Sequence, residues 1–283
     1  MAEFAGFAVT TDTIACGVHF LPDDPLDTVA QKAVRVNASD LIAKGCHPRA
    51  MTLASAWHRD ADEADHAAFA RGLAADLGAY GIALLGGDTA RLPTGQGPVF
   101  TVTMFGEPNG DRVPDRSGAV PGDLVAVSGL IGDAMLGLRQ ATGAWDAGIH
   151  ADAVLAAYRR PNVRDVASTV AWHATASLDV SDGLIADAGH IAARSGVRVV
   201  IEADAVPISG AGRAYLAGGG AFADLVTGGD DYAVLMTTGR DDEGVLKRDG
   251  FIVIGRCVPG SGVALQAANG TDITPKRTGF RHF

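Results

Sequence analysis

Residues 26–45 read LDTVAQKAVRVNASDLIAKG, and their pattern predicts an amphipathic helix that Gly45 ends. Four of its residues recur at intervals of four, three and four and therefore share one helical face: Val29, Ala33, Val36 and Asp40. A carboxylate on an apolar face is costly unless a cation or hydrogen-bond donors satisfy it. Asp40 is therefore a candidate metal ligand, and an ordinary structural aspartate is an equally supported alternative.

The segments around this helix alternate between strand-like and helix-like patterns. In the first half we predict strands at residues 7–11, 49–56 and 99–105, a helix at 62–80, and a short apolar run at 82–85. In the second half we predict strands at 124–128, 176–180, 197–202, 232–237 and 251–254, with helices at 132–142, 151–158 and 184–195. Prolines and glycines crowd residues 107–123 and indicate a junction. We expect two mixed α/β domains, residues 1–112 and 113–283.

Composition narrows the class of protein. Of the 283 residues, 47% are hydrophobic, yet no apolar run reaches the ~18 residues that a membrane span needs, and no signal peptide is expected. The net charge of −10 and the four lysines make nucleic acid an improbable partner. Three widely spaced cysteines lack zinc-ligand spacing and favour a reduced, cytoplasmic protein.

Acidic residues gather at predicted strand ends and beside glycines. Besides Asp40, four segments stand out: Thr10-Thr11-Asp12-Thr13, Gly86-Gly87-Asp88-Thr89, Asp179-Val180-Ser181-Asp182-Gly183 and Gly228-Gly229-Asp230-Asp231-Tyr232. Carboxylates and hydroxyls are hard oxygen ligands suited to Mg²⁺. Glycines allow a backbone to approach phosphate, and a helix start is a natural anion site.

Each of these segments also has a structural interpretation. Asp12 could form an Asx turn, residues 86–89 a Gly-rich hairpin, and residues 228–232 a turn into a strand. Ser181 or Asp182 could simply cap the following helix. His19, by itself, would be a packed loop histidine. The phosphate loop GxxxxGK[ST], the dinucleotide fingerprint, the protein-kinase signature set and the GxSxG elbow are all absent from the sequence. ATP would therefore need another binding architecture.

The order of the motifs is more specific than any one of them. TTDT, GVHFLPDD, KAVRVNASDLIAKG, GGDT, RSGAVPGD, SLDVSDGLIADAGHIAARSGV, GGDDY and GFRHF follow one another from Thr10 to Phe283. In this order the chain resembles the thiamine-monophosphate kinase family, within the superfamily of aminoimidazole-ribonucleotide synthetase and selenophosphate synthetase. The resemblance covers essentially the whole chain, and GVHF and GFRHF point to this member.

The resemblance implies a homodimer with its active site in the cleft between the domains. The implied reaction is transfer of a phosphoryl group from ATP to thiamine monophosphate, giving thiamine diphosphate and ADP, without a general base. Several Mg²⁺ ions are expected on Thr10, Thr11, Asp12, Asp40, Asp88, Asp179 and Asp182. ATP is expected at Gly87, Asp88, Arg116 and Ser181, and thiamine monophosphate at His19, Asp230 and Phe280.

The chain departs from the family pattern in two places. Family members usually carry a GDDAA segment upstream of TTDT with a further metal-binding aspartate, whereas only nine residues without that motif precede Thr10 here. Asp230 stands where GGEDY has a glutamate. We expect such a chain to bind ATP and to turn over slowly. Two alternatives stay open: another ATP-dependent enzyme of the superfamily with a different acceptor, and a non-catalytic nucleotide-binding homodimer.

Overall fold

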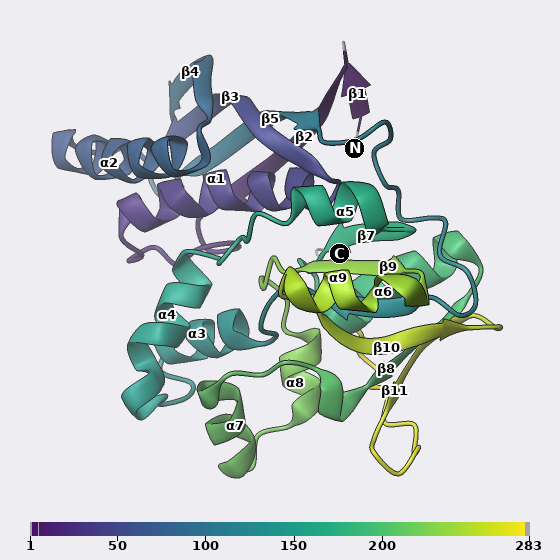
Figure 1. Cartoon of the computed structure of the whole chain (residues 1–283). Helices are drawn as coiled ribbons and strands as arrows, with labels where there is room; N and C mark the ends of the chain where they lie inside the picture. The colour runs from purple at the N-terminus through teal and green to yellow at the C-terminus, as the bar shows by residue number, and fades with distance from the viewer. Residues whose placement is uncertain (1, 5, 281–283) are drawn as a thin grey trace.

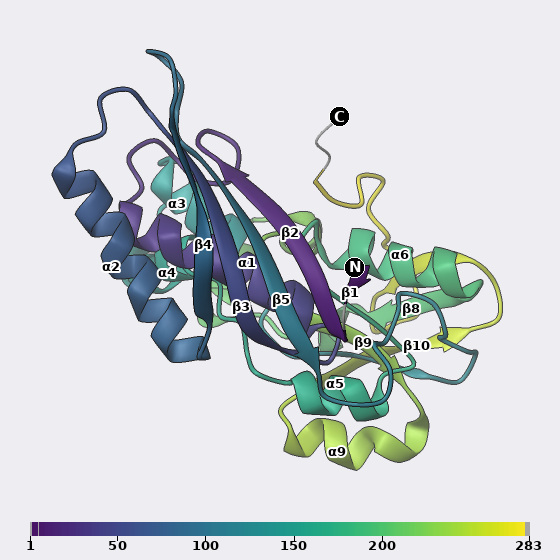
Figure 2. The ribbon, with the colours of Figure 1, turned by 90° about the horizontal axis from the view of Figure 1, so that it is seen from above.

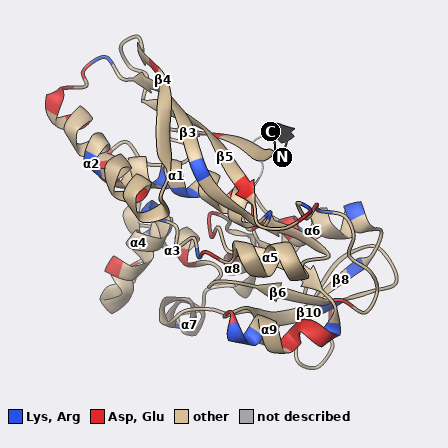
Figure 3. Cartoon of the chain, turned by 45° about the horizontal axis from the view of Figure 1, so that its top comes forward, with Lys and Arg blue, Asp and Glu red and all other residues tan. Residues whose placement is uncertain are grey.

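The computed structural model describes residues 2–4, by their backbone, and residues 6–280. It contains two β-sheets with helices packed around them, and it confirms the predicted mixed α/β class (Figure 1). Lysine and arginine residues are found in both halves of the molecule and are not gathered in one place (Figure 3). None of the described helices is long and apolar enough to cross a membrane.

The first sheet has the strand order β1-β2-β5-β3-β4. Its strands are β1 (Ala2–Phe4), β2 (Phe7–Ala15), β3 (Cys46–Trp57), β4 (Ala83–Arg91) and β5 (Val99–Pro108). Only β3 and β4 pair in parallel. The helices α1 (Leu26–Ile42) and α2 (Glu63–Tyr80) lie on one face of this sheet, and no described helix covers the other (Figures 1 and 2). We call the uncovered side the open face.

The ends of the two helices follow from local chemistry. The Asp62 side chain accepts a hydrogen bond from the Asp65 N–H, and the Asp65 side chain accepts one from the Asp62 N–H. Helix α2 therefore begins with a capping box. Gly81 ends it in the left-handed conformation at φ 65°. In α1 the apolar residues of the predicted face, Val29, Ala33 and Val36, are buried. The helix ends at Ile42, two residues before its predicted end at Lys44.

The second sheet has the order β11-β8-β10-β6-β9-β7. Its strands are β6 (Leu124–Val127), β7 (Ala176–Asp179), β8 (Arg198–Glu202), β9 (Val234–Thr238), β10 (Ile252–Val258) and β11 (Gly262–Gln266). Three helices accompany the sheet: α5 (Ala167–His173), α6 (Leu184–Ser195) and α9 (Glu243–Arg248). Four more gather beside it: α3 (Asp133–Ala141), α4 (Ala151–Arg159), α7 (Gly210–Ala217) and α8 (Phe222–Thr227).

Helix α1 joins the two sheets because residues from both belong to one buried cluster. Val36 of α1 and Met104 of β5 share this cluster with Val234 and Met236 of β9. The packing is therefore continuous across the predicted boundary at residues 112 and 113, which stays a prediction.

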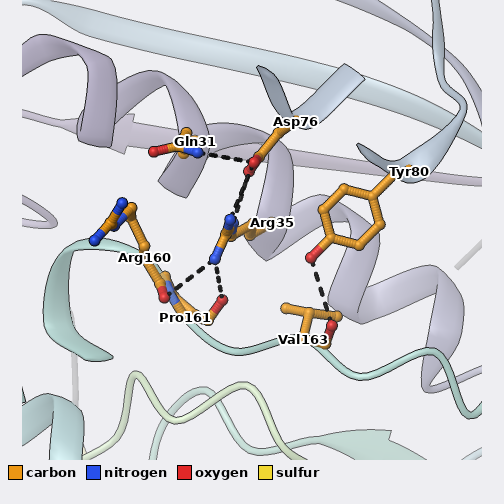
Figure 4. Close-up of polar contacts among 7 residues, drawn as sticks. All are labelled: Gln31, Arg35, Asp76, Tyr80, Arg160, Pro161 and Val163. Carbon is orange, nitrogen blue, oxygen red and sulfur yellow. Dashed lines mark hydrogen bonds and ion pairs between the residues drawn. The ribbon is translucent and has the colours of Figure 1, made fainter. Parts of the chain in front are cut away.

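A polar network fixes the chain after α4 against α1 and α2 (Figure 4). The Arg35 Nε lies 2.6 Å from Oδ2 of Asp76, whose side chain is only 2% exposed. Arg35 Nη1 also donates to the carbonyl oxygens of Arg160 and Pro161, at 3.3 and 3.1 Å. One planar guanidinium with five donors can satisfy all three partners, so α4 is held beside α1.

Strand β4 differs from the sequence interpretation of residues 86–89 as a hairpin turn. The strand continues through Gly86, Gly87 and Asp88 in parallel register with β3, after a register shift that leaves Leu85 without a partner in the β3–β4 ladder. A β-carbon on Gly87 would lie 1.8 Å from the Leu53 carbonyl oxygen, so only glycine allows this close pairing. The elements β1, β11, α5, α7, α8 and α9 were not predicted, because segments of eight residues or fewer carry little periodic signal.

Candidate functional site

A cavity of about 340 Å³ lies where α1 meets the loops that follow β7 and precede β9. Residues from both halves of the chain line it. Nine residues predicted from the sequence line it: Asp12, His19, Asp40, Arg116, Asp179, Ser181, Asp182, Asp230 and Phe280. Arg281, His282 and Phe283 of the terminal GFRHF motif lie outside the described residues.

The Asn37-Ala38-Ser39-Asp40 segment of α1 connects the two sheets at this cavity. Asn37 Oδ1 accepts the backbone N–H of Asp12 on β2, at 3.1 Å. Ser39 Oγ donates to Asp179 Oδ2 at the end of β7, at 2.7 Å. Asp40 accepts a hydrogen bond from the hydroxyl of Thr10. Asn37 and Ser39 are fully buried, so each has a positioning role that the sequence interpretation missed.

Three carboxyl groups crowd this junction and repel one another. Burial, and then the charge of Asp40, raise the pKa of Asp12 to about 6. Burial raises the pKa of Asp179 well above its usual range, with Asp40 as the next cause. Protons or bound cations reduce the electrostatic repulsion among such carboxylates. The carboxylates and the Thr10 hydroxyl beside Asp40 supply hard oxygen donors, the ligand type that Mg²⁺ prefers.

The charge of the cavity wall is strongly negative. Five aspartates line the cavity, at positions 12, 40, 179, 182 and 230. Of the described lining residues, only Arg116 carries a permanent positive charge. An anionic ligand would therefore be repelled unless cations entered with it.

The loop before β9 is held in a strained conformation at the cavity. Asp230 and Tyr232 have φ angles of 65° and 51°, which non-glycine residues seldom adopt. The Asp230 N–H donates to the Ser181 carbonyl and the Tyr232 N–H to the Val180 carbonyl, both at 2.8 Å. A β-carbon on Gly229 would lie 2.5 Å from the Ser181 oxygen. The loops 179–183 and 228–232 are therefore locked together.

The start of α6 resolves one of the alternatives for the Asp179–Gly183 segment. Neither Ser181 nor Asp182 caps the helix; instead Asp187 Oδ2 accepts the N–H groups of Asp182 and Gly183, at 3.0 and 3.1 Å. Burial raises the pKa of Asp187 to about 7. Potential ligand atoms of Asp182, Asp187 and His190 all lie within 4.8 Å of one another. The sequence signal for Asp187 was its position on the buried face of α6 with Leu184.

The cavity wall also has an apolar component. It is lined by Ile14, Val18, Val36, Ala134, Met135, Leu138 and Tyr158, beside Phe280. The Nδ1 atom of His19 accepts the Ala15 N–H at 3.1 Å, so the neutral ring carries its proton on Nε2. The cavity can therefore hold a ligand with an aromatic or aliphatic part as well as anionic groups.

Four predicted residues do not line this cavity: Thr10, whose hydroxyl donates to Asp40, and Thr11, Gly87 and Asp88. Thr11 alternates with Thr10 along β2 and is exposed, and its hydroxyl lies 3.0 Å from that of Thr103. Asp88 belongs to the sheet row of Ala54, Thr101 and Thr13, three strands away from β2. At ~4.8 Å per strand that separation is about 14 Å.

Comparisons with known proteins agree on one family. The family model described as AIR synthase related protein, N-terminal domain, matches residues 2–107. A thiamine-monophosphate kinase from Caulobacter vibrioides is 40% identical over 288 residues, covering 97% of this chain and 80% of the relative. A thiamine-monophosphate kinase from Aquifex aeolicus is 32% identical and covers 97% of this chain and 87% of the relative.

Solved structures match the fold along the whole chain. The structure described as AaThiL complexed with AMPPCP and TMP has a TM-score of 0.88 and 31% identity, and the match covers 100% of this chain and 89% of that one. Hydrogenase maturation protein HypE in complex with ATP has a TM-score of 0.82 over 100% of this chain and 87% of that one, at 17% identity. At that identity the second likeness concerns the fold alone.

Proposed function

Because this chain belongs to the thiamine-monophosphate kinase family, we propose that its cavity transfers the terminal phosphoryl group of ATP to thiamine monophosphate, giving thiamine diphosphate and ADP. The chain is an ATP-dependent kinase. A relative of this family has been solved with AMPPCP and TMP together, which favours this acceptor over those of other enzymes that share the fold.

The observation that carries the proposal is the charge of the cavity, with five aspartates and one arginine among its described lining residues. A site that binds two phosphate-bearing substrates must offset this charge, and several Mg²⁺ ions would do so. Asp12, Asp40, Asp179 and Asp182 would hold them, with the Thr10 hydroxyl beside Asp40. When bound, Mg²⁺ neutralises phosphate charge and favours alignment of donor and acceptor oxygens.

The protein's own groups orient the two substrates. Arg116 and Ser181 lie in the cavity wall and would contact the phosphates of ATP. His19, Asp230 and Phe280 would contact thiamine monophosphate, with its heterocycles against the apolar part of the wall. No general base is required, because the acceptor is a phosphate oxygen that is already deprotonated at neutral pH. Catalysis then rests on positioning and electrostatics.

The open face of the first sheet supports a homodimer. All nine residues of β4 are exposed, including Leu84 at 46% and Leu85 at 64%. By strand register Thr11 and Asp88 share the open face, so a second copy on this face would cover both of them. In this arrangement Gly87 and Asp88 contribute to nucleotide and metal binding from the subunit interface. Light scattering of the wild type and Leu85→Glu would test it, with a monomeric wild type as the contrary result.

The proposal also includes two domains and a cytoplasmic location. The matched family model ends at residue 107 and β6 begins at Leu124, which agrees with domains at 1–112 and 113–283. The three cysteines are widely spaced in the sequence, and Cys46 and Cys257 are buried, which agrees with a reduced, cytoplasmic protein.

The reaction can be tested directly with the purified chain, ATP, Mg²⁺ and thiamine monophosphate. Chromatography should show thiamine diphosphate and ADP formed in equal amounts. Thiamine without its phosphate is the matched control acceptor and should give no product. Release of ADP without thiamine diphosphate would point to a different acceptor, whereas ATP binding without any ADP release would indicate a non-catalytic protein.

A further inference from the structure

Lys32 is a buried lysine that the reaction scheme above does not use. It lies on α1, is only 1% exposed, and is among the largest fully buried side chains of the described residues. An ammonium group in such a place is costly unless its hydrogens are satisfied. Its position within the helix gave no sign of this burial, because lysine is usually exposed.

The Lys32 ammonium contacts residues from three different segments that line the cavity. Nζ donates to the His19 carbonyl oxygen at 2.8 Å and to Asp230 Oδ2 at 2.5 Å. It also lies 4.6 Å from the centre of the Tyr158 ring, where a cation is attracted to the aromatic face. These three partners belong to the β2–α1 loop, the loop before β9 and helix α4, and all three line the cavity. A single buried charge therefore connects three segments that are distant in sequence.

The Asp230 contact is the most consequential of the three. Asp230 has a φ of 65°, and its side chain is 29% exposed at the cavity. A strained residue keeps its conformation only where surrounding contacts hold it. The backbone N–H of Asp230 is held by Ser181, and the ion pair with Lys32 holds the side chain. Lys32 thus determines the direction in which the Asp230 carboxylate faces the cavity.

We propose that Lys32 is a positioning residue for the acceptor side of the site, because its ammonium ties Asp230, the His19 loop and Tyr158 into one preorganised wall. The inference rests on the proposed function, in which Asp230 and His19 contact thiamine monophosphate. Lys32 itself is buried and is not among the residues that line the cavity. Arg116 and Ser181, assigned to ATP, are not among its described hydrogen-bond partners. Its loss therefore affects the two substrates unequally.

The test compares Lys32→Met with the wild type in steady-state assays that vary each substrate in turn. Methionine keeps the length of the side chain and removes the ammonium. The KM for thiamine monophosphate should rise about tenfold, while the KM for ATP stays within about twofold. Lys32→Arg, which keeps the charge, should show a smaller rise. A variant that only lost stability would instead lower kcat through its active fraction and leave both KM values alone.

Arg35→Met is the matched control, because Arg35 lies three residues further along α1 and its partners Asp76, Arg160 and Pro161 do not line the cavity (Figure 4). It should lower the melting temperature without changing either KM. Equal increases in both KM values for Lys32→Met, or an unchanged KM for thiamine monophosphate, would overturn the inference. If Lys32→Met does not fold, the two KM values of Lys32→Arg are compared with those of the wild type instead. The inference then requires that only the KM for thiamine monophosphate rises. A wild type that makes no thiamine diphosphate would instead reject the proposed function.

Discussion

Asp40→Asn should have opposite effects on activity and on the stability of the metal-free protein. The side chain keeps its shape, and its remaining oxygen can still accept the Thr10 hydrogen bond. One of the five negative charges of the cavity wall is lost. If Asp40 is a metal ligand, the bound substrates lose their alignment, and a displacement of ~1 Å costs on the order of 10²-fold in rate.

The stability effect follows from the pKa of Asp12, which is raised from 3.8 to about 6 in the folded protein. A carboxyl with a raised pKa binds its proton more tightly in the folded state than in the unfolded state, so stability falls as the pH rises from about 4 to about 6. A shift of two units corresponds to roughly 3 kcal/mol. Burial is the larger cause of the raised pKa and the charge of Asp40 the second. Removing the Asp40 charge should therefore increase the free energy of unfolding by at most ~1.5 kcal/mol at pH 8, and should not change it below pH 4.

The assay pairs two measurements on wild type and Asp40→Asn. Steady-state kinetics with Mg²⁺ should show kcat/KM lower by about two orders of magnitude. Urea unfolding in a chelator, at pH 8 and at pH 4, should show the variant at least as stable as the wild type at pH 8, with the difference gone at pH 4. Near-normal activity would refute the metal-ligand role. A clear loss of stability at pH 8 would refute the electrostatic argument.

Three further predictions address other parts of the structure. Calorimetry should show ATP affinity collapsing in excess chelator, because the cavity wall is acidic, and unchanged affinity would indicate a phosphate site elsewhere. Ser39→Ala leaves the buried Asp179 carboxyl without its 2.7 Å donor, so urea unfolding should show a loss of ~1–3 kcal/mol, and Ser39→Thr is the control that keeps the hydroxyl. Asp76→Asn removes the negative charge that pairs with Arg35, whose side chain is 21% exposed, and should cost ~2 kcal/mol in the same assay without changing either KM; an altered KM would show that this network reaches the cavity.

The sequence by itself determined the features that depend on neighbours along the chain. The 3.6-residue period of residues 26–45 identified α1 and placed Asp40 on its buried face. The order of eight short motifs identified the family, because each motif is a local backbone requirement that can be recognised without knowing where its partners lie.

Only the tertiary structure decided which of these local features meet. Gly86-Gly87-Asp88 and Gly228-Gly229-Asp230 look alike in sequence, yet the first is part of an edge strand and the second is a loop at the cavity. Lys32 would be read as a solvated helix residue, and its burial depends on a carboxylate almost two hundred positions away. Asn37 and Ser39 gained their roles in the same way, from strands of two different sheets. The physical reason is that secondary structure follows from short-range sterics and periodicity, whereas the surroundings of a side chain follow from the order in which strands pair and helices pack.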